Sequence, residues 1–308
     1  MLPFPETASD PVALADWLEI NALLSDDKNC SGGDLESALR KSPGSDEVEP
    51  ATIEARISEA FLELEQRAEN AGEAYPFEVD IVSAVVQAKK KWERLPAYIF
   101  CLCLSYFGWD AKKNARIFPK VFPRRMFEML SCAAAINYLD GTGVGFGSPR
   151  EKLPEGFIDA VNELCKRMGE GEGCKIREHR VGQDDTLDIV VWKNFVSTVC
   201  RPGKLLLFGQ CATGKNWPDK LSELQPDDFC EEWMIDQPVS PCVKSFFIPH
   251  RIRSTEWSRV SRKAGIIFDR CRISYWVHSK EAKRRQREGI KLEPFLVWSK
   301  KELSKRKK

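Results

Sequence analysis

The sequence predicts a mixed α/β protein, in which a helical N-terminal domain precedes a mixed β-sheet flanked by helices. Apolar residues recur at helical spacing through the first ~140 residues. Short apolar runs typical of buried strands appear later, at Ile189–Val191 and Leu205–Phe208. A segment rich in glycine and proline separates the two parts. We therefore predict a helical domain over 1–140, a linker over 141–156, and a sheet domain with a basic tail over 157–308.

Composition limits the class of protein. The 308 residues are 43% hydrophobic and 30% charged, which suits one large globular domain or two ordinary ones. No apolar run approaches the ~18 residues of a membrane span, and residues 1–10 lack the pattern of a signal peptide. We therefore expect a cytoplasmic protein with no membrane partner. The 11 cysteines include no CxxC pair, so we expect reduced core residues rather than disulfides or a metal site.

The net charge of +1 conceals a basic C-terminal end. Residues 280–308 contain 12 Lys and Arg against 4 Asp and Glu, so this segment alone carries +8. A basic surface suits a polyanion such as DNA, although a solvated helix face has the same composition. The predicted nucleic-acid contacts are Arg251, Arg253, Arg259, Arg262, Lys263, Arg284 and Arg285.

The N-terminal helices are predicted from their caps and apolar spacing. Asp10-Pro11 is a typical helix start, and Ser31 caps a second, short helix. Ile53 begins an apolar stripe at helical spacing. Further helices are expected over 80–92, 96–108 and 123–139. These helices carry no catalytic constellation, so a role in docking a partner protein is the function we consider for them.

The second half alternates between helices and strands. An amphipathic helix, Phe157 to Met168, opens it and ends at Gly169. Strands are expected over 174–180, 188–192, 204–208, 244–249 and within 265–277. Helices are expected over 217–224, 228–234 and 254–263. The order α-β-β-β-α-β-α-β predicts a mixed sheet with helices on its faces.

Polar residues end the two apolar runs, where a purely structural strand has little use for them. Asp188 precedes the first run, and Gln210 and Lys215 follow the second. Metal-dependent phosphodiester cleavage needs carboxylates to hold Mg²⁺ and a cation near the scissile phosphate. We therefore predict catalytic roles for Asp188, Gln210 and Lys215, joined by Glu163 if its helix turns it inward. The alternatives are an aspartate that only caps a turn and a solvated helix glutamate.

Three segments resemble the PD-(D/E)xK restriction-endonuclease-like nucleases, and most closely their Mrr-type branch. These are FIDAVNELCKRMG with Glu163, VGQDDTLDI with Asp184 and Asp188, and LLFGQ ending at Gln210. The resemblance covers about residues 155–280. It implies a restriction-endonuclease-like fold and a DNA endonuclease that uses Mg²⁺ or Mn²⁺, commonly in restriction or phage defence. The implied metal ligands are Asp188, Glu163 and Asp184.

The chain departs from that pattern in two places. Thr186 stands where the acidic turn of the family has glycine. The family has Gln-x-Lys, whereas Ala212 lies two residues after Gln210 and Lys215 lies five after it. An active nuclease then needs Lys215 to fold back over the site. The alternative is a degenerate domain that binds nucleic acid without cutting it and acts as an adaptor.

A phosphate-binding loop is a second interpretation of the same residues. Gly209 to Lys215 match GxxxxGK after a predicted strand. Asn216, however, occupies the position of the Ser or Thr that binds Mg²⁺, and Pro218 disfavours helical geometry at the preceding residue. We therefore rank a P-loop NTPase below a nuclease and below an adaptor.

Overall fold

Two β-sheets organise the protein, one in each half of the chain. The computed structural model describes residues 2, 9–41, 49–108, 123–176, 185–195, 201–281 and 290–307. The smaller sheet has the order β1-β3-β2, and the larger has the order β4-β5-β6-β7-β8. The predicted mixed α/β class is confirmed. Within the described ranges, no helix combines the length and apolar composition needed to cross a membrane.

The five-stranded sheet is mixed. Its strands are β4 (Thr142–Gly145), β5 (Ile189–Lys193), β6 (Leu205–Cys211), β7 (Val243–Phe247) and β8 (Ile266–Phe268). The pairs β4–β5 and β5–β6 are antiparallel, whereas β6–β7 and β7–β8 are parallel. Parallel neighbours need a crossover, and α8 (Pro226–Trp233) and α9 (Trp257–Ala264) lie in the two connections. The predicted strands over 188–192, 204–208 and 244–249 are thus confirmed, apart from their end residues.

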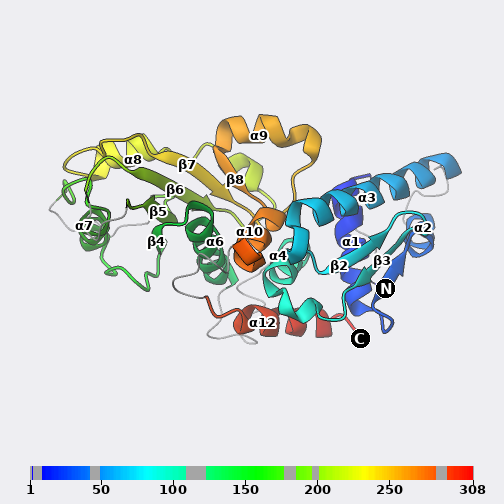
Figure 1. Ribbon diagram of the computed structural model, residues 1–308. Helices are drawn as coiled ribbons and strands as arrows, with labels where there is room; N and C mark the ends of the chain where they lie inside the picture. Colours follow the sequence, from blue (N-terminus) through cyan, green and yellow to red (C-terminus); the bar gives the residue numbers. More distant parts are fainter. Residues whose placement is uncertain are drawn as a thin grey trace.

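The two faces of this sheet are covered by different helices. Ile189, Val191 and Leu207 pack in one hydrophobic cluster with α6 (Pro123–Leu139) and α10 (Arg270–His278). The alternate residues Val190 and Phe208 pack in another cluster with α7 (Phe157–Met168) and α8. Because alternate residues of a strand point to opposite faces, α6 and α7 lie on opposite sides of the sheet. Figure 1 shows α6 beside α10 and α7 apart from both, at the left end of the sheet.

The predicted linker over 141–156 is corrected by the structure, since it contributes the edge strand β4. The glycines that suggested a linker permit close strand approach instead. A Cβ at Gly143 would lie 2.7 Å from Val191 Cγ2, and one at Gly141 would lie 2.5 Å from the Trp192 carbonyl oxygen. Glycine in a strand often marks such an approach of a neighbouring backbone.

Three other secondary-structure predictions are also corrected. The predicted helix over 80–92 is instead the hairpin of β2 (Phe77–Asp80) and β3 (Val85–Ala88), closed by a hydrogen bond from Ser83 N–H to Asp80 Oδ1 (3.1 Å). The predicted helix over 217–224 is only a 3₁₀ turn, η4 (Trp217–Lys220). The strand predicted within 265–277 is present as β8, and it is short because Asp269 caps α10 by accepting from Arg272 N–H. Cys174 forms only an isolated bridge to Met234, and residues 177–180 lie outside the described ranges.

The remaining helices of the N-terminal half follow the predicted caps. They are α1 (Pro11–Leu24), α2 (Gly32–Arg40), α3 (Pro50–Ala71) and α4 (Pro96–Phe107). Asp10 Oδ1 accepts from Val12 N–H at the start of α1 (3.1 Å). Ser31 and Asp34 form a reciprocal capping box at α2. Local signals therefore placed these helix starts correctly.

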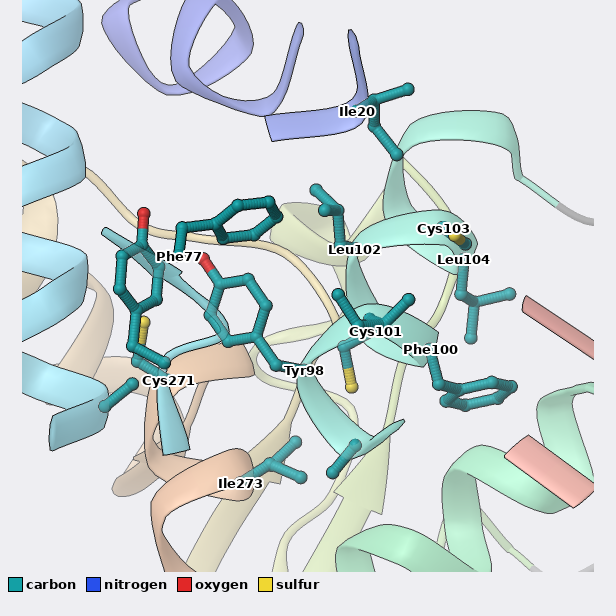
Figure 2. Packing of buried hydrophobic residues seen from close by; sticks show 14 of the residues in the cluster. Ile20, Phe77, Tyr98, Phe100, Cys101, Leu102, Cys103, Leu104, Cys271 and Ile273 are labelled. Carbon is teal, nitrogen blue, oxygen red and sulfur yellow. The ribbon is translucent and has the colours of Figure 1, made fainter. Parts of the chain in front are cut away.

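Helix α4 is buried on all sides and lies at the centre of the main core (Figure 2). Tyr98 points toward Phe77, with ring centroids 6.2 Å apart. Phe100 points the other way and makes edge contacts with Phe295 and Trp298 of α12 (Glu293–Ser304). The C-terminal helix therefore packs on the N-terminal half. Eight of the ten described cysteines are buried, as expected of core residues.

A buried charge network ties α1 and α3 to α10. The Arg67 guanidinium donates to Asp16 (2.7 Å) and Glu19 (2.8 Å), and Arg270 donates to both oxygens of Asp16 (2.9 and 3.0 Å). Burial raises the pKa of Asp16, but the charges of Arg270 and Arg67 outweigh burial and lower that pKa to about 2. The Glu19 carboxylate also accepts from the Tyr75 hydroxyl (2.7 Å).

The network extends to Arg251 and thereby corrects one predicted DNA contact. Arg251 is 7% exposed, and its guanidinium binds Glu63 (3.1 Å) and Asp269. A buried charge needs such partners, because transfer out of water without them is very costly. Arg251 is therefore a structural residue whose guanidinium faces carboxylates rather than solvent.

Candidate active site

Asp188 is fixed where three strands of the large sheet meet. Its backbone N–H donates to the Gly209 carbonyl (2.9 Å), and its carbonyl accepts from Phe146 N–H (2.7 Å). Its side-chain Oδ2 accepts from the Cys211 N–H at the end of β6 (2.6 Å). Asp188 therefore directly precedes β5, which pairs with β6, the strand that contains Gln210. This agrees with the predicted order of these residues.

Glu128 of α6 approaches Asp188 from the face of the sheet that α6 covers. Gly147, just beyond β4, lies close to both. A Cβ at Gly147 would lie 3.0 Å from Asp188 Oδ1 and 3.0 Å from Glu128 Oε2. The two carboxylate oxygens are thus separated by no more than twice that distance. A side chain at position 147 would crowd both carboxylates, so glycine at this position allows their approach.

Two further side chains adjoin this carboxylate pair, Asp188 and Glu128. Arg125 Nη1 donates to Glu128 Oε2 (2.7 Å) and to the Gly147 carbonyl (3.3 Å). Burial raises the pKa of the Cys211 thiol, and the charges of Asp188 and Glu128 raise it further. The thiol therefore stays protonated, and Arg125 supplies positive charge beside the pair.

Glu163 lies elsewhere. It is on α7, on the opposite side of the sheet from α6, and its carboxylate accepts from Arg167 Nε (2.7 Å) one helical turn away. This hydrogen bond lowers the pKa of Glu163. The structure therefore pairs Asp188 with a glutamate of α6 and does not bring Glu163 to it.

Gln210 is buried on the face of β6 opposite Cys211. Its Nε2 donates to Glu223 Oε2 (2.6 Å), while its buried Oε1 has no hydrogen-bond partner among the residues that the structure describes. Ala212, two residues on, packs in a cluster with Leu221 and Ile248. Because Cys211 packs toward α6, strand alternation places Gln210 and Ala212 across the sheet from the carboxylate pair.

Lys215 is exposed in the loop that follows β6. Gly209 lies inside β6 rather than in the loop, and the 3₁₀ turn η4 stands where a phosphate-binding loop has a helix. A P-loop binds phosphate partly through the N-terminus of that helix. The structure therefore gives no support to the NTPase alternative. Asp184 lies outside the described residues.

The sequence reasoning missed Glu128 and Arg125. Glu128 is the one acidic residue of the largely apolar segment 123–139, and this was its only local signal. A charged residue on a helix that mostly packs against a core is either paired or functional. The helix was assigned to the N-terminal domain, so its proximity to the sheet was not anticipated.

The predicted basic residues of the second half have mixed surroundings. Arg259, Arg262 and Lys263 are exposed on α9, and Arg259 also pairs with Glu256 (3.2 Å). Arg253 pairs with Asp10 (2.8 Å). Arg284 and Arg285 lie outside the described residues. The exposed cations therefore gather on α9, at the top of Figure 1.

Asp188 and Glu128 carry the type of ligand that Mg²⁺ binds in proteins. Mg²⁺ is usually held by one or two carboxylates, with water and substrate phosphate oxygens completing its shell. Asp188 and Glu128 can supply two carboxylates at this spacing. In the part of the chain that the structure describes, no cluster of three or more His, Cys, Asp or Glu is suited to a metal.

The chain matches no protein-family model, and no curated protein and no solved structure is significantly similar to it. The functional interpretation therefore depends on the geometry of its own residues.

His250, which contacts the loop after β6, is expected to make the free energy of unfolding depend on pH. Its Nε2 lies 3.2 Å from the Thr213 carbonyl oxygen, and burial lowers the pKa of His250 from 6.5 to about 4. Between these values the unfolded chain binds more protons, so the free energy of unfolding should rise with pH from 4 to 6.5, by up to ~3 kcal/mol. Urea unfolding of the wild type and His250→Gln across this range measures the effect. An equally steep pH dependence in His250→Gln would contradict the assignment.

Proposed function

We propose that this chain is a metal-dependent nuclease that hydrolyses phosphodiester bonds in DNA, with Asp188 and Glu128 as its metal-binding carboxylates. The observation that carries the proposal is the approach of both side chains to Gly147, each with an oxygen 3.0 Å from the position of a Cβ there. Like charges at this spacing are unfavourable without a counter-ion. Arg125 already offsets part of this repulsion through Glu128, and a metal ion bound by both carboxylates would offset more of it.

The chemistry follows from the groups around the pair. A bound Mg²⁺ or Mn²⁺ would lower the pKa of a water molecule and polarise a phosphoryl oxygen. Asp188 is held in place by the Cys211 N–H, and Glu128 by Arg125, so neither carboxylate needs to reorganise during the reaction. In hydrolysis, the water oxygen bonds to phosphorus while one P–O ester bond breaks. The water loses one proton and the leaving oxygen gains one.

DNA as the substrate is supported by the basic residues near the end of the sheet. Helix α9 presents Arg259, Arg262 and Lys263 to solvent. It packs in the cluster of Ala212 and Phe246, on the face of the sheet opposite the carboxylate pair, so DNA held by α9 would reach the pair around the end of the sheet. Lys and Arg side chains of this kind contact phosphates and give salt-dependent affinity. A role as effector in bacterial restriction or phage defence, in the cytoplasm, rests on the resemblance to Mrr-type nucleases.

A non-catalytic adaptor is the second candidate, favoured by one specific observation. The position two residues after Gln210 is Ala212, which is 3% exposed and packs in a hydrophobic cluster. The lysine of the family pattern is thus replaced by a core residue. In this alternative the domain binds nucleic acid without cutting it, and the N-terminal helices dock a partner protein.

Cleavage of supercoiled plasmid tests the proposal directly. Purified protein is incubated with Mg²⁺ or Mn²⁺, with and without EDTA, beside Asp188→Asn. We expect nicked or linear product with metal and none with EDTA or with Asp188→Asn, whose DNA affinity should persist. A wild type that binds DNA but cuts neither plasmid nor single-stranded DNA with either ion would contradict the nuclease and support the adaptor.

A further inference from the structure

We infer that Arg125 is the catalytic cation of this site, in place of the lysine that the PD-(D/E)xK pattern has two residues after its glutamine. The inference rests on the proposed function, because it assigns a role within the same reaction. It also explains how the site could work although Ala212 stands where the family pattern has lysine, which is otherwise an objection to the proposed nuclease.

A lysine at position 212, where the family pattern has one, would disturb the hydrophobic core. Ala212 packs with Leu221 and Phe246 on the face of the sheet opposite α6. The carboxylate pair lies on the α6 side. A cation for this pair must therefore come from another element, and α6 itself provides one.

Arg125 lies on the same helix as Glu128, three residues earlier, and is 13% exposed. Its Nη1 lies 2.7 Å from Glu128 Oε2 and 3.3 Å from the Gly147 carbonyl oxygen. A Cβ at Gly145 would lie 3.4 Å from the same Nη1, which is ordinary van der Waals contact, so the guanidinium packs against this glycine. The next alternate glycine, Gly147, lies close to both carboxylates.

The guanidinium still has a donor to offer. Among the described residues, the buried Arg125 Nε has no hydrogen-bond acceptor, although it forms an ion pair with the Glu151 carboxylate at 3.9 Å. A buried N–H without an acceptor is costly, so a bound acceptor at this point would be favourable. Arginine has five N–H donors in a planar fork that matches the oxygens of a phosphate. A scissile phosphate bound beside Asp188 and Glu128 is an acceptor with this chemistry.

The role follows from charge. As water attacks phosphorus and the P–O ester bond breaks, negative charge grows on the non-bridging phosphate oxygens. Arg125 keeps its proton throughout and donates hydrogen bonds to one of those oxygens. It also offsets the repulsion between the phosphate and the carboxylate pair. Donors fixed in place before the reaction are effective because they need no reorganisation in the transition state.

Single-turnover cleavage by Arg125→Ala and Arg125→Lys tests the inference, with Arg124→Ala as the matched control. Arg124 is the exposed neighbour on the same helix. We expect Arg125→Ala to cut ~10²–10³-fold more slowly than the wild type, as when one transition-state donor is removed. Arg125→Lys should be intermediate, and Arg124→Ala should equal the wild type. DNA affinity, measured with Ca²⁺ in place of Mg²⁺, should fall far less than the rate in the two Arg125 variants and stay unchanged in Arg124→Ala.

Chemical rescue separates a catalytic from a structural role. Added guanidinium at millimolar concentration should restore part of the rate of Arg125→Ala, and it should not alter Arg124→Ala. Thermal unfolding identifies a variant that fails to fold, in which case Arg125→Lys and Arg125→Gln replace the alanine. Wild-type rates in folded Arg125 variants would overturn the inference while leaving the nuclease intact. A wild type that cuts no better than Asp188→Asn would overturn the proposed function and the role of Arg125 with it.

Discussion

Replacing Glu128 by glutamine is expected to slow metal-dependent DNA cleavage on the order of 10³-fold, whereas Glu163→Gln is expected to leave the rate unchanged. Both changes remove one negative charge from a helix glutamate and keep its size. Only Glu128 lies beside Asp188 at Gly147. Glu163 is paired with Arg167 on the other side of the sheet. Because the two substitutions are chemically identical, a difference in rate between them reports where each carboxylate lies.

Metal binding gives this prediction a readout that does not depend on catalysis. Titration of Mn²⁺ into the protein, followed by calorimetry, should show weaker binding for Glu128→Gln and Asp188→Asn and wild-type binding for Glu163→Gln. Two carboxylates that share one ion should also be non-additive, so the double variant should lose little beyond either single one. If Glu163→Gln lost metal and activity while Glu128→Gln kept both, the glutamate of α7 would be the ligand, as in the family pattern.

The sequence identified one half of the carboxylate pair because Asp188 carries a local signal. An aspartate directly before a β-branched apolar run is visible from composition alone. Glu128 is 60 positions earlier, and nothing in the intervening sequence relates the two. Which helix brings its glutamate to Asp188 depends on which face of the sheet each helix covers. That is a tertiary property: α6 and α7 cover opposite faces of the sheet, although both precede β5 in the sequence.

The fold shows the same division between local and long-range information. Helix starts at Asp10 and Ser31 were predicted because their caps form within three residues. Strand β4 was missed because its glycines are needed for the close approach of β5, which the sequence does not show. Arg251 was taken for a DNA contact because its partner Glu63 is 188 residues away. Burial of a charge through such a distant partner leaves no periodic pattern in the sequence.

Arg270→Met is expected to lower the free energy of unfolding by about 3–5 kcal/mol, the largest stability effect that we predict for a single substitution. Arg270 is fully buried, and its guanidinium donates to Asp16 and to the Pro249 carbonyl. Methionine fills much of the space but leaves the Asp16 carboxylate, whose pKa two guanidinium groups now hold at about 2, with only Arg67. The cost therefore comes from an under-compensated buried charge rather than from lost volume.

Urea unfolding of Arg270→Met beside Arg259→Ala tests this reasoning. Arg259 is 63% exposed in its pair with Glu256, and surface pairs of this kind contribute only about 0–1 kcal/mol. Adding Asp16→Asn to Arg270→Met should cost less than the two single changes combined, because it removes the charge that was left unpaired. Equal costs for Arg270→Met and Arg259→Ala would mean that Arg67 alone satisfies Asp16. The network would then join α10 to the N-terminal helices through shape rather than charge, and Arg67→Met would become the more damaging substitution.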